Sequence, residues 1–293
     1  MENKQTILIA GATGNIGKAA AIALAKRDAR VVILGRSHDK LQATKDSIYV
    51  KLSEAQIEYQ EKDLATMVVD FSDMESVRLS AEEAMNRFPV INGLVLSVGA
   101  LIQNGPHILD SGHEVMFATN VMGPFLFTQL LLKRMQKSDG LVLHVIALFD
   151  KKINWDDLES TRNHRSMAAF DRTKTCNRVI AGELARRYAG KISSVAFDPT
   201  YVIDKSDPDL GKRWPSGFRG FLWRMMTVFF AKPPAIAGEP IANLMLRVQD
   251  RSAINGTLFK LDRRIEKPDK AMDDKKLGKR LWDELELLTR LTH

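Results

Sequence analysis

Three glycines near the start of the chain have the spacing of a phosphate-binding turn. They lie in the stretch GATGNIGK, after the apolar run TILIA and before the alanine-rich run KAAAIALAKRD. Side chains at these positions would keep phosphates away from the backbone amides at the start of the helix. Because the turn lies between a strand pattern and a helix pattern, it favours dinucleotide binding over a purely structural turn. The turn residues predicted to line the cofactor are Gly11, Thr13, Gly14, Asn15, Ile16 and Gly17.

Arg36 and Ser37 follow the second apolar run, RVVILG, where a nucleotide-binding protein distinguishes its cofactors. A carboxylate there would bind the ribose hydroxyls of NAD, whereas an arginine would pair with the additional phosphate of NADP. The chain has no acid at this point, so we predict NADP(H) as the cofactor; the alternative for Arg36 is a solvated surface charge. Asp70, after the third run, is predicted to accept a hydrogen bond from adenine or to cap the next helix.

Apolar runs alternate with helical patterns along the chain, which predicts an α/β fold with a parallel sheet covered on both faces. The predicted strands are residues 6–11, 30–36, 66–73, 91–100, 140–148, 192–199 and 256–262. The predicted helices are residues 18–28, 39–52, 74–88, 114–137, 167–189 and 237–250, followed by an amphipathic C-terminal helix. We therefore predict one doubly wound Rossmann domain of about seven parallel strands. Its parts are a cofactor-binding core at 1–200, a lid at 201–236 and C-terminal elements at 237–293.

The composition bounds the class of protein. A chain of 293 residues, 45% of them hydrophobic, can bury one large core. The net charge of +7 is scattered instead of forming a dense basic run, so we expect no nucleic-acid binding. Cys176 is the single cysteine, and the N-terminus has no secretory signal pattern, which predicts a cytoplasmic protein. No window of 18 uncharged apolar residues occurs, so no membrane span is expected.

The order of these motifs resembles the short-chain dehydrogenase/reductase superfamily over nearly the whole chain, especially its retinol dehydrogenase and protochlorophyllide reductase branch. The supporting stretches are GATGNIGK, VILGRS, GHEVMFATNVMGPFLFTQLLL, TKTCNRVIAGELARR and LWDELELLTRL. The resemblance implies that Asn120 holds its helix open for a water connected to the lysine, and that Lys174 binds the nicotinamide ribose. It also implies that Ala147 stands in place of the family serine, and Phe170 in place of the family tyrosine.

The chain departs from the family pattern at three further points around the cofactor. Residues 96–99 read Leu-Ser-Val-Gly where the family has Asn-Asn-Ala-Gly, and Asn15 stands where glycine is usual in the single-domain branch. Pro199 precedes Thr200 where a Pro-Gly pair usually flanks the nicotinamide. Asparagine adopts the left-handed backbone conformation more readily than most residues, so we expect the glycine turn to survive. Gly99 and Pro199 are predicted to contact the cofactor.

Phe170 and Ala147 together remove a proton donor and a hydroxyl that would stabilise the alkoxide formed during ketone reduction. We therefore expect ordinary ketone reduction to be lost and NADP(H) binding to be kept. An iminium-like or conjugated acceptor would reduce the need for a proton donor, and a rearrangement or cyclisation promoted by proximity is a second hypothesis. An inactive protein that senses NADP(H) or scaffolds a partner is the alternative from another class.

Four residues could replace the missing groups, each with a structural alternative. Asp171 could stabilise a cation or shuttle a proton, the alternative being a solvated helix carboxylate. Asp198 could lie near the nicotinamide or cap the following turn. His144 lies three residues before Ala147 in the same strand, so the two side chains point to opposite faces of the sheet. This favours a core histidine with satisfied hydrogen bonds. Tyr201 could offer a phenol from the loop after the sixth strand.

The segment 214–231 follows the sixth strand, where the resembling family builds its substrate lid. Its large apolar side chains are Trp214, Phe218, Phe221, Trp223, Met225, Met226 and Phe229. They imply a hydrophobic small-molecule substrate such as a secondary metabolite, a dimer contact or a contact with a membrane surface, the alternative being a plain core helix. Helices like 114–137 and 167–189 form a four-helix interface in that family, so a homodimer or homotetramer is expected.

Overall fold

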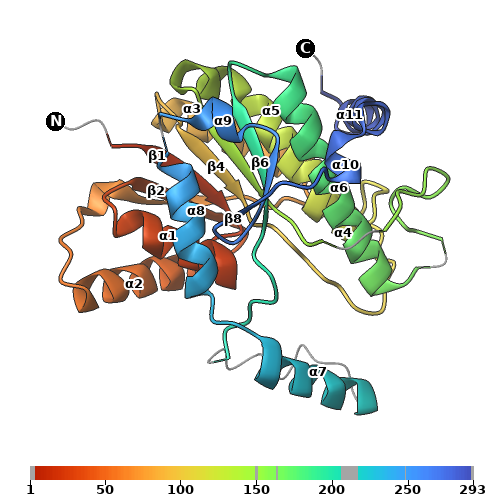
Figure 1. Cartoon of the computed structure of the whole chain (residues 1–293), viewed down its shortest axis with the longest axis horizontal. Coiled ribbons are helices and arrows are strands. Elements are labelled where there is room, and N and C mark those ends of the chain that lie inside the picture. Colours follow the sequence, from red (N-terminus) through yellow and green to blue (C-terminus); the bar gives the residue numbers. More distant parts are fainter. Residues whose placement is uncertain (1–3, 149–150, 163, 206–216, 248, 292–293) are drawn as a thin grey trace.

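An eight-stranded sheet forms the centre of the computed structural model, which describes residues 4–291 except 149–150, 163, 206–216 and 248 (Figure 1). Its strand order is β3-β2-β1-β4-β5-β6-β7-β8. The strands are β1 (Thr6–Ala10), β2 (Arg30–Gly35), β3 (Leu64–Val68), β4 (Gly93–Leu96), β5 (Leu141–Val145), β6 (Ser193–Asp198), β7 (Thr257–Lys260) and β8 (Arg263–Ile265). The first seven strands run parallel, as predicted. The sequence did not predict β8, an antiparallel strand, because its residues Arg-Arg-Ile carry no apolar run.

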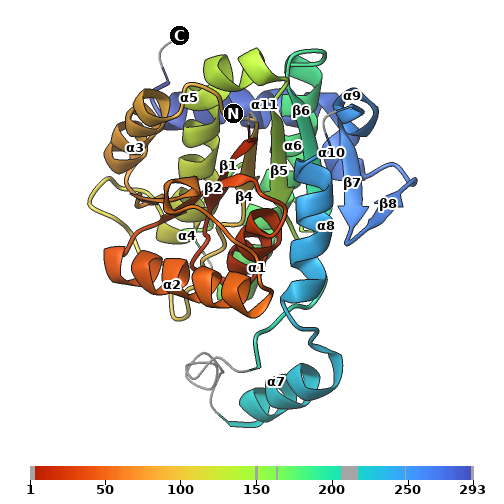
Figure 2. The same ribbon diagram turned by 90° about the vertical axis from the view of Figure 1, so that its left-hand side faces the viewer.

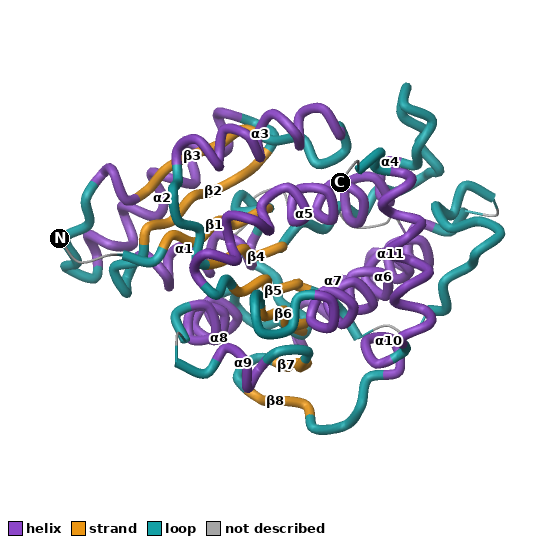
Figure 3. Tube along the Cα trace, turned by 90° about the horizontal axis from the view of Figure 1, so that it is seen from above, coloured by secondary structure: helices purple, strands orange, loops and turns teal. Residues whose placement is uncertain are grey.

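Helices cover both faces of this sheet (Figures 1 and 3). They are α1 (Asn15–Ala25), α2 (His38–Glu54), α3 (Met74–Arg87), α4 (Val115–Phe117), α5 (Gly123–Met135), α6 (Ser166–Arg187), α7 (Gly217–Phe230), α8 (Ala235–Met245), α9 (Arg251–Ile254), α10 (Lys270–Asp273) and α11 (Lys275–Leu288). Buried residues of α1, α2 and α8 form one core with the sheet, and those of α3, α5, α6 and α11 form the other. The predicted doubly wound α/β arrangement is therefore confirmed.

Alternation along the strands explains why both faces are buried. In β1, Ile7 and Ile9 contribute to the core under α1 and α8, whereas Leu8 contributes to the core under α3 and α5. In β2, Val31 and Val32 divide in the same way. Successive side chains point to opposite faces of a strand, so an uninterrupted apolar run supplies both cores at once.

The helical stretch predicted at 114–137 changes geometry along its length. Between α4 and α5 the residues Ala118–Met122 form a π-helix, which opens the backbone at Asn120. The whole stretch Val115–Ser138 is long and apolar enough to cross a membrane, but 78% of its most apolar window is buried in the fold. That degree of burial is typical of a core helix.

Helix α11 packs along α6 through a buried tryptophan (Figure 2). Trp282 is 1% exposed, and its ring meets that of Phe125 edge to face, with centroids 5.0 Å apart. Its indole nitrogen donates to Glu286 at 2.7 Å, so the one polar atom of the side chain is satisfied. The Arg187 guanidinium lies 4.8 Å from the centroid of the indole ring.

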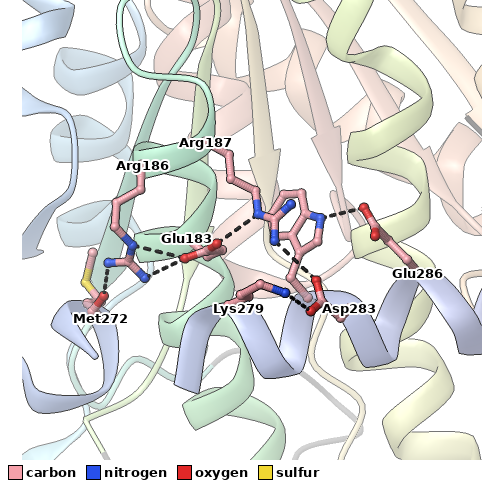
Figure 4. A network of polar contacts seen from close by, with 8 residues as sticks. Glu183, Arg186, Arg187, Met272, Lys279, Asp283 and Glu286 are labelled. Carbon is pink, nitrogen blue, oxygen red and sulfur yellow. Dashed lines mark hydrogen bonds and ion pairs between the residues drawn. The ribbon is translucent and has the colours of Figure 1, made fainter. Parts of the chain in front are cut away.

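Charged side chains connect α6 to α10 and α11 (Figure 4). Glu183 accepts from Arg186 at 3.0 Å and from Arg187 at 2.8 Å, and Arg187 also reaches Asp283 at 3.4 Å. Arg186 donates to the Met272 carbonyl at 2.6 Å. Helices of the same chain therefore cover the outward side of α6, which the resembling family uses between subunits. The homodimer stays a prediction.

Replacing Trp282 with alanine should lower the free energy of unfolding by about 3–5 kcal/mol, because it leaves a large cavity between α11 and the core. Leu287 lies on the same helix and is 72% exposed, so Leu287→Ala is the matched control, with an expected change within about 0.5 kcal/mol. Urea denaturation monitored by circular dichroism measures both. Equal losses in the two variants would contradict the docking of α11 described above.

Candidate active site

The glycine turn between β1 and α1 has no room for side chains. Gly11 has a φ of +77°, and a Cβ there would lie 2.8 Å from the Ser97 carbonyl oxygen. A Cβ on Gly17 would lie 2.5 Å from the Gly11 carbonyl oxygen. Gly14 is the N-cap of α1, and no side chain accepts hydrogen bonds from the first amides of the helix. These amides remain available to an anion, so the turn fits a pyrophosphate.

The glycine turn is intact with asparagine at position 15, as expected. Asn15 is the first residue of α1, and it does not occur among the residues with positive φ. The turn has its unusual backbone at Gly11 and its closest approaches at Gly11 and Gly17. Asparagine at the first helical position therefore needs no left-handed backbone. Thr13 and Ile16 lie in the same turn, Thr13 being exposed and Ile16 half-buried.

Arg36 begins the loop after β2, one residue past Gly35. Its side chain is exposed, and within the described chain it forms no hydrogen bond or ion pair. Ser37 caps α2 by accepting from the Lys40 amide at 3.3 Å. Asp70 accepts from both the amide and the hydroxyl of Ser72, at 2.9 and 2.7 Å. It does not cap the next helix, because the N-cap of α3 is Asp73.

Lys174 of α6 reaches the carboxyl ends of two neighbouring strands. Its Nζ donates to the Val98 carbonyl at 3.0 Å and to the Val145 carbonyl at 3.4 Å. The side chain is buried, and burial lowers the pKa of its ammonium to about 8. An ammonium has three donors, so one remains for a ligand hydroxyl. No carboxylate in the described part of the chain forms an ion pair with this lysine.

Gly99 and Phe170 lie next to this ammonium, and Ala147 follows the strand that holds it. A Cβ on Gly99 would lie 3.1 Å from the Lys174 Nζ, so glycine is what allows the lysine to approach the loop after β4. The Phe170 ring is half-buried, and its centroid lies 5.4 Å from the same nitrogen. Ala147 lies two residues past Val145, whose carbonyl holds the lysine. The structure thus brings together residues that the sequence separates by up to 75 positions.

Asn120 ties the π-helical stretch to this group. Its Oδ1 accepts from the Ala100 amide at 2.7 Å, and its Nδ2 donates to the Ala100 carbonyl at 2.9 Å. Nδ2 also donates to the Thr173 hydroxyl at 3.2 Å. The Asn120 carbonyl accepts from Asn177 at 3.1 Å, an α6 contact that sequence reasoning missed. Asn120 therefore fixes the loop after β4 against α6.

Asp171 is buried, contrary to one of the two readings of the sequence. It is 8% exposed, and its Oδ1 has no hydrogen-bond partner. Burial raises the pKa of this carboxyl, and the charge of Lys151 offsets part of the effect. The solvated reading was wrong because helix periodicity does not reveal that the segment after β5 approaches this side of α6. A buried carboxylate without a partner is typical of functional sites.

His144 of β5 is a core residue, as its parity predicted, but its hydrogen bonds are not satisfied. Its Nε2 has no partner, and burial lowers the pKa of the ring to about 3. The histidine lines a cavity of about 10 Å³, close to the space needed for a single water. Asn120 and Asn177 line the same cavity, so it adjoins the Lys174 group.

Two further candidates, Asp198 and Tyr201, form hydrogen bonds in or next to the loop after β6. Asp198 accepts from the Thr200 amide at 2.9 Å, which is the capping role, and burial raises its pKa. Thr200 follows Pro199 with a φ of +65°, a conformation that favours glycine. This explains why a Pro-Gly pair suits that turn. The Tyr201 hydroxyl pairs with Thr227 of α7 at 3.0 Å instead of approaching Lys174.

The segment expected to form a lid is not a plain core helix. Phe221, Met225, Met226 and Phe229 of α7 are all exposed. Figures 1 and 2 show α7 apart from the rest of the chain, beyond the carboxyl edge of the sheet. Its apolar pattern alone could not distinguish an exposed helix from a buried one. Trp214 lies outside the described residues.

Comparison with known proteins defines the class. Residues 5–150 match the family described as short chain dehydrogenase. The chain is 28% identical to retinol dehydrogenase 12 of Mus musculus over 283 residues, covering 95% of this chain and 84% of that protein. It is 29% identical to a putative daunorubicin C-13 ketoreductase of a Streptomyces species over 199 residues, covering 68% of this chain and 66% of that protein.

Solved structures of the same class share the fold. A variant of actinorhodin polyketide ketoreductase with NADPH aligns with a TM-score of 0.68 at 16% identity, covering 89% of this chain and 97% of that one. The protein is therefore a homologue of the short-chain dehydrogenases/reductases, oxidoreductases that use NAD(P)H. The predicted superfamily is confirmed at this level.

The buried His144 should make the fold sensitive to acid. Its folded pKa of about 3 lies below the ordinary value of 6.5, so the unfolded chain binds the proton first as the pH falls. Between pH 7.5 and 5 this residue should cost about 2 kcal/mol of unfolding free energy. His144→Gln should lack that loss, whereas His38→Gln, at an exposed position, should keep it. Urea titrations across this range measure the difference; parallel profiles for native protein and His144→Gln would contradict it.

Proposed function

We propose that the protein binds NADP(H) at the carboxyl edge of its sheet and acts on a hydrophobic small molecule without a phenol as proton donor. The observation that carries this proposal is the Phe170 ring 5.4 Å from the buried Lys174 ammonium. A hydrocarbon ring at that point neither donates a proton nor stabilises an oxyanion. Ala147 likewise offers no hydroxyl at the end of β5.

The cofactor half of the proposal rests on groups that remain available to a ligand. Gly11 and Gly17 leave space for the pyrophosphate, and the first turn of α1 supplies amides. The unpartnered Arg36 guanidinium suits the additional phosphate of NADP(H). The free donor of Lys174 suits a ribose hydroxyl. Bound NADPH would supply a hydride, and these residues would bind and orient the cofactor.

The substrate half rests on the missing groups and on the relatives. A cationic, iminium-like acceptor yields a neutral product on reduction and needs no acid, and a conjugated acceptor or a rearrangement held by proximity are the other members of this class. The buried, unpartnered carboxylate of Asp171, next to Phe170 on α6, supports stabilisation of a cation. Relatives named for retinol and daunorubicin support a bulky apolar substrate, as in secondary metabolism.

An inactive protein that senses NADP(H) is the second candidate. The same two residues, Phe170 and Ala147, favour it, because both groups that serve ketone reduction in the resembling family are replaced. The two candidates agree on cofactor binding and differ in turnover. Conversion of an apolar iminium with consumption of NADPH would exclude the sensing role.

Arg36→Ala should weaken NADPH binding by about tenfold to a hundredfold, because a charge-assisted hydrogen bond to a phosphate is lost. NADH binding should stay nearly unchanged, since NADH lacks that phosphate. Fluorescence titration of both cofactors measures the affinities. Arg263→Ala is the matched control, because Arg263 is exposed in β8 at the opposite end of the sheet. Absence of binding by the native protein to either cofactor would exclude the cofactor half of the proposal.

Phe170→Tyr combined with Ala147→Ser should create ketone reduction at a rate about a hundredfold or more above the native protein, because an acid and an oxyanion donor are added beside Lys174. Each single variant should give a smaller gain. NADPH oxidation with a bulky aromatic ketone, with product analysis, is the measurement. A native protein that already reduces simple ketones as fast as the double variant would contradict the proposed chemistry.

A further inference from the structure

Helix α7 concentrates exposed apolar surface. The structure describes sixteen large hydrophobic residues as exposed, and seven of them lie on this single helix. They are Phe221, Leu222, Met225, Met226, Val228, Phe229 and Phe230, with exposed fractions from 41% to 69%. Exposed apolar residues elsewhere are scattered, as is normal for a protein surface, but a concentration of this kind marks an interaction site.

The exposed residues form a continuous face. At 100° per residue, the seven positions span an arc of about 200° from Val228 through Phe221 and Leu222 to Phe230. The opposite side carries Gly220 and Thr227, which are buried. The Thr227 hydroxyl pairs with Tyr201 at 3.0 Å. The helix thus turns its small and polar side towards the chain and its apolar side outward.

The charges along this region are mainly basic. Residues 217–238 contain Arg219, Arg224 and Lys232 and no aspartate or glutamate. In the preceding stretch, residues 204–216, three basic residues are balanced by three acidic ones: Lys205, Lys212 and Arg213 against Asp204, Asp207 and Asp209. The Lys205 ammonium donates to the Val228 carbonyl at 2.9 Å. An apolar helix with a net positive charge complements a surface that is apolar inside and anionic at its border.

The attachment of α7 leaves the seven apolar side chains exposed. The segments before and after the helix meet where Lys232 donates its amide to the Tyr201 carbonyl at 3.0 Å and accepts from Ile203 at 3.1 Å. The helix therefore projects from the loop after β6, and Figures 1 and 2 show it beyond the carboxyl edge of the sheet. This is the edge that carries Lys174 and the glycine turn.

We infer that α7 docks in the plane of an anionic phospholipid surface. Its 14 residues span about 21 Å, which is less than the hydrocarbon thickness of a bilayer, so the helix lies in the interface and does not cross it. Docking buries the apolar arc in the acyl region and keeps Arg224, which lies outside the arc, at the headgroups. It also turns the carboxyl edge of the sheet towards the bilayer, a source of apolar substrates.

Vesicle co-sedimentation tests this inference without cofactor or substrate, so its result is independent of the proposed function. The full chain is mixed with phosphatidylcholine vesicles and with phosphatidylcholine–phosphatidylserine vesicles, at low and high salt. We expect binding to the anionic vesicles, weakened by salt and by omission of phosphatidylserine. Phe229→Glu with Phe230→Glu should reduce binding about tenfold or more, because two exposed aromatic anchors are lost.

The matched control is Leu79→Glu with Leu287→Glu, which adds the same charge at exposed apolar positions of α3 and α11. It should bind nearly as the native chain does, and thermal unfolding of all variants checks that they are folded. Absence of native binding to anionic vesicles would overturn the inference, as would equal losses in the two double variants. A native dimer that the α7 variant dissociates, without vesicle binding, would instead assign this face to a second copy of the chain.

Discussion

The hydrogen bonds from Lys174 to the carbonyls of Val98 and Val145 are the contacts around which the site is arranged. They hold α6 against the ends of β4 and β5, and they partly offset the cost of burying an ammonium without a carboxylate. Gly99 makes the approach possible because it has no side chain, and Asn120 fixes the adjoining loop. The helix that carries this lysine, α6, is itself buried along most of its length.

The C-terminal elements contribute to the burial of α6. Most of α6 is buried, and α10 and α11 of the same chain complete its enclosure through Trp282 and the ion pairs of Glu183. In the resembling family, helices like those at 114–137 and 167–189 meet across a subunit interface. Here the chain itself covers them, and the exposed apolar surface gathers on α7 instead.

The site is asymmetric in its chemistry. On the cofactor side, glycines, free amides and two cations are arranged for an anionic ligand. On the other side, the Phe170 ring faces the lysine, an arrangement that stabilises the ammonium through the ring electrons. The nearby Thr173 hydroxyl donates to the Phe170 carbonyl, and the Tyr201 hydroxyl pairs with Thr227 of α7, away from Lys174. Under the proposed function, binding and orientation contribute more than acid catalysis.

Periodicity and residue type by themselves determined the parallel sheet and the glycine turn at its carboxyl edge. The grouping of Asn120, Gly99 and Lys174 was expected from the family resemblance alone. Periodicity and residue type did not determine the burial of Asp171, the unsatisfied ring nitrogen of His144, the helical backbone of Asn15 or the exposure of α7. Each of these depends on which distant segment packs against a residue. A repeating pattern records which side of an element is apolar, but only the tertiary structure decides what covers that side.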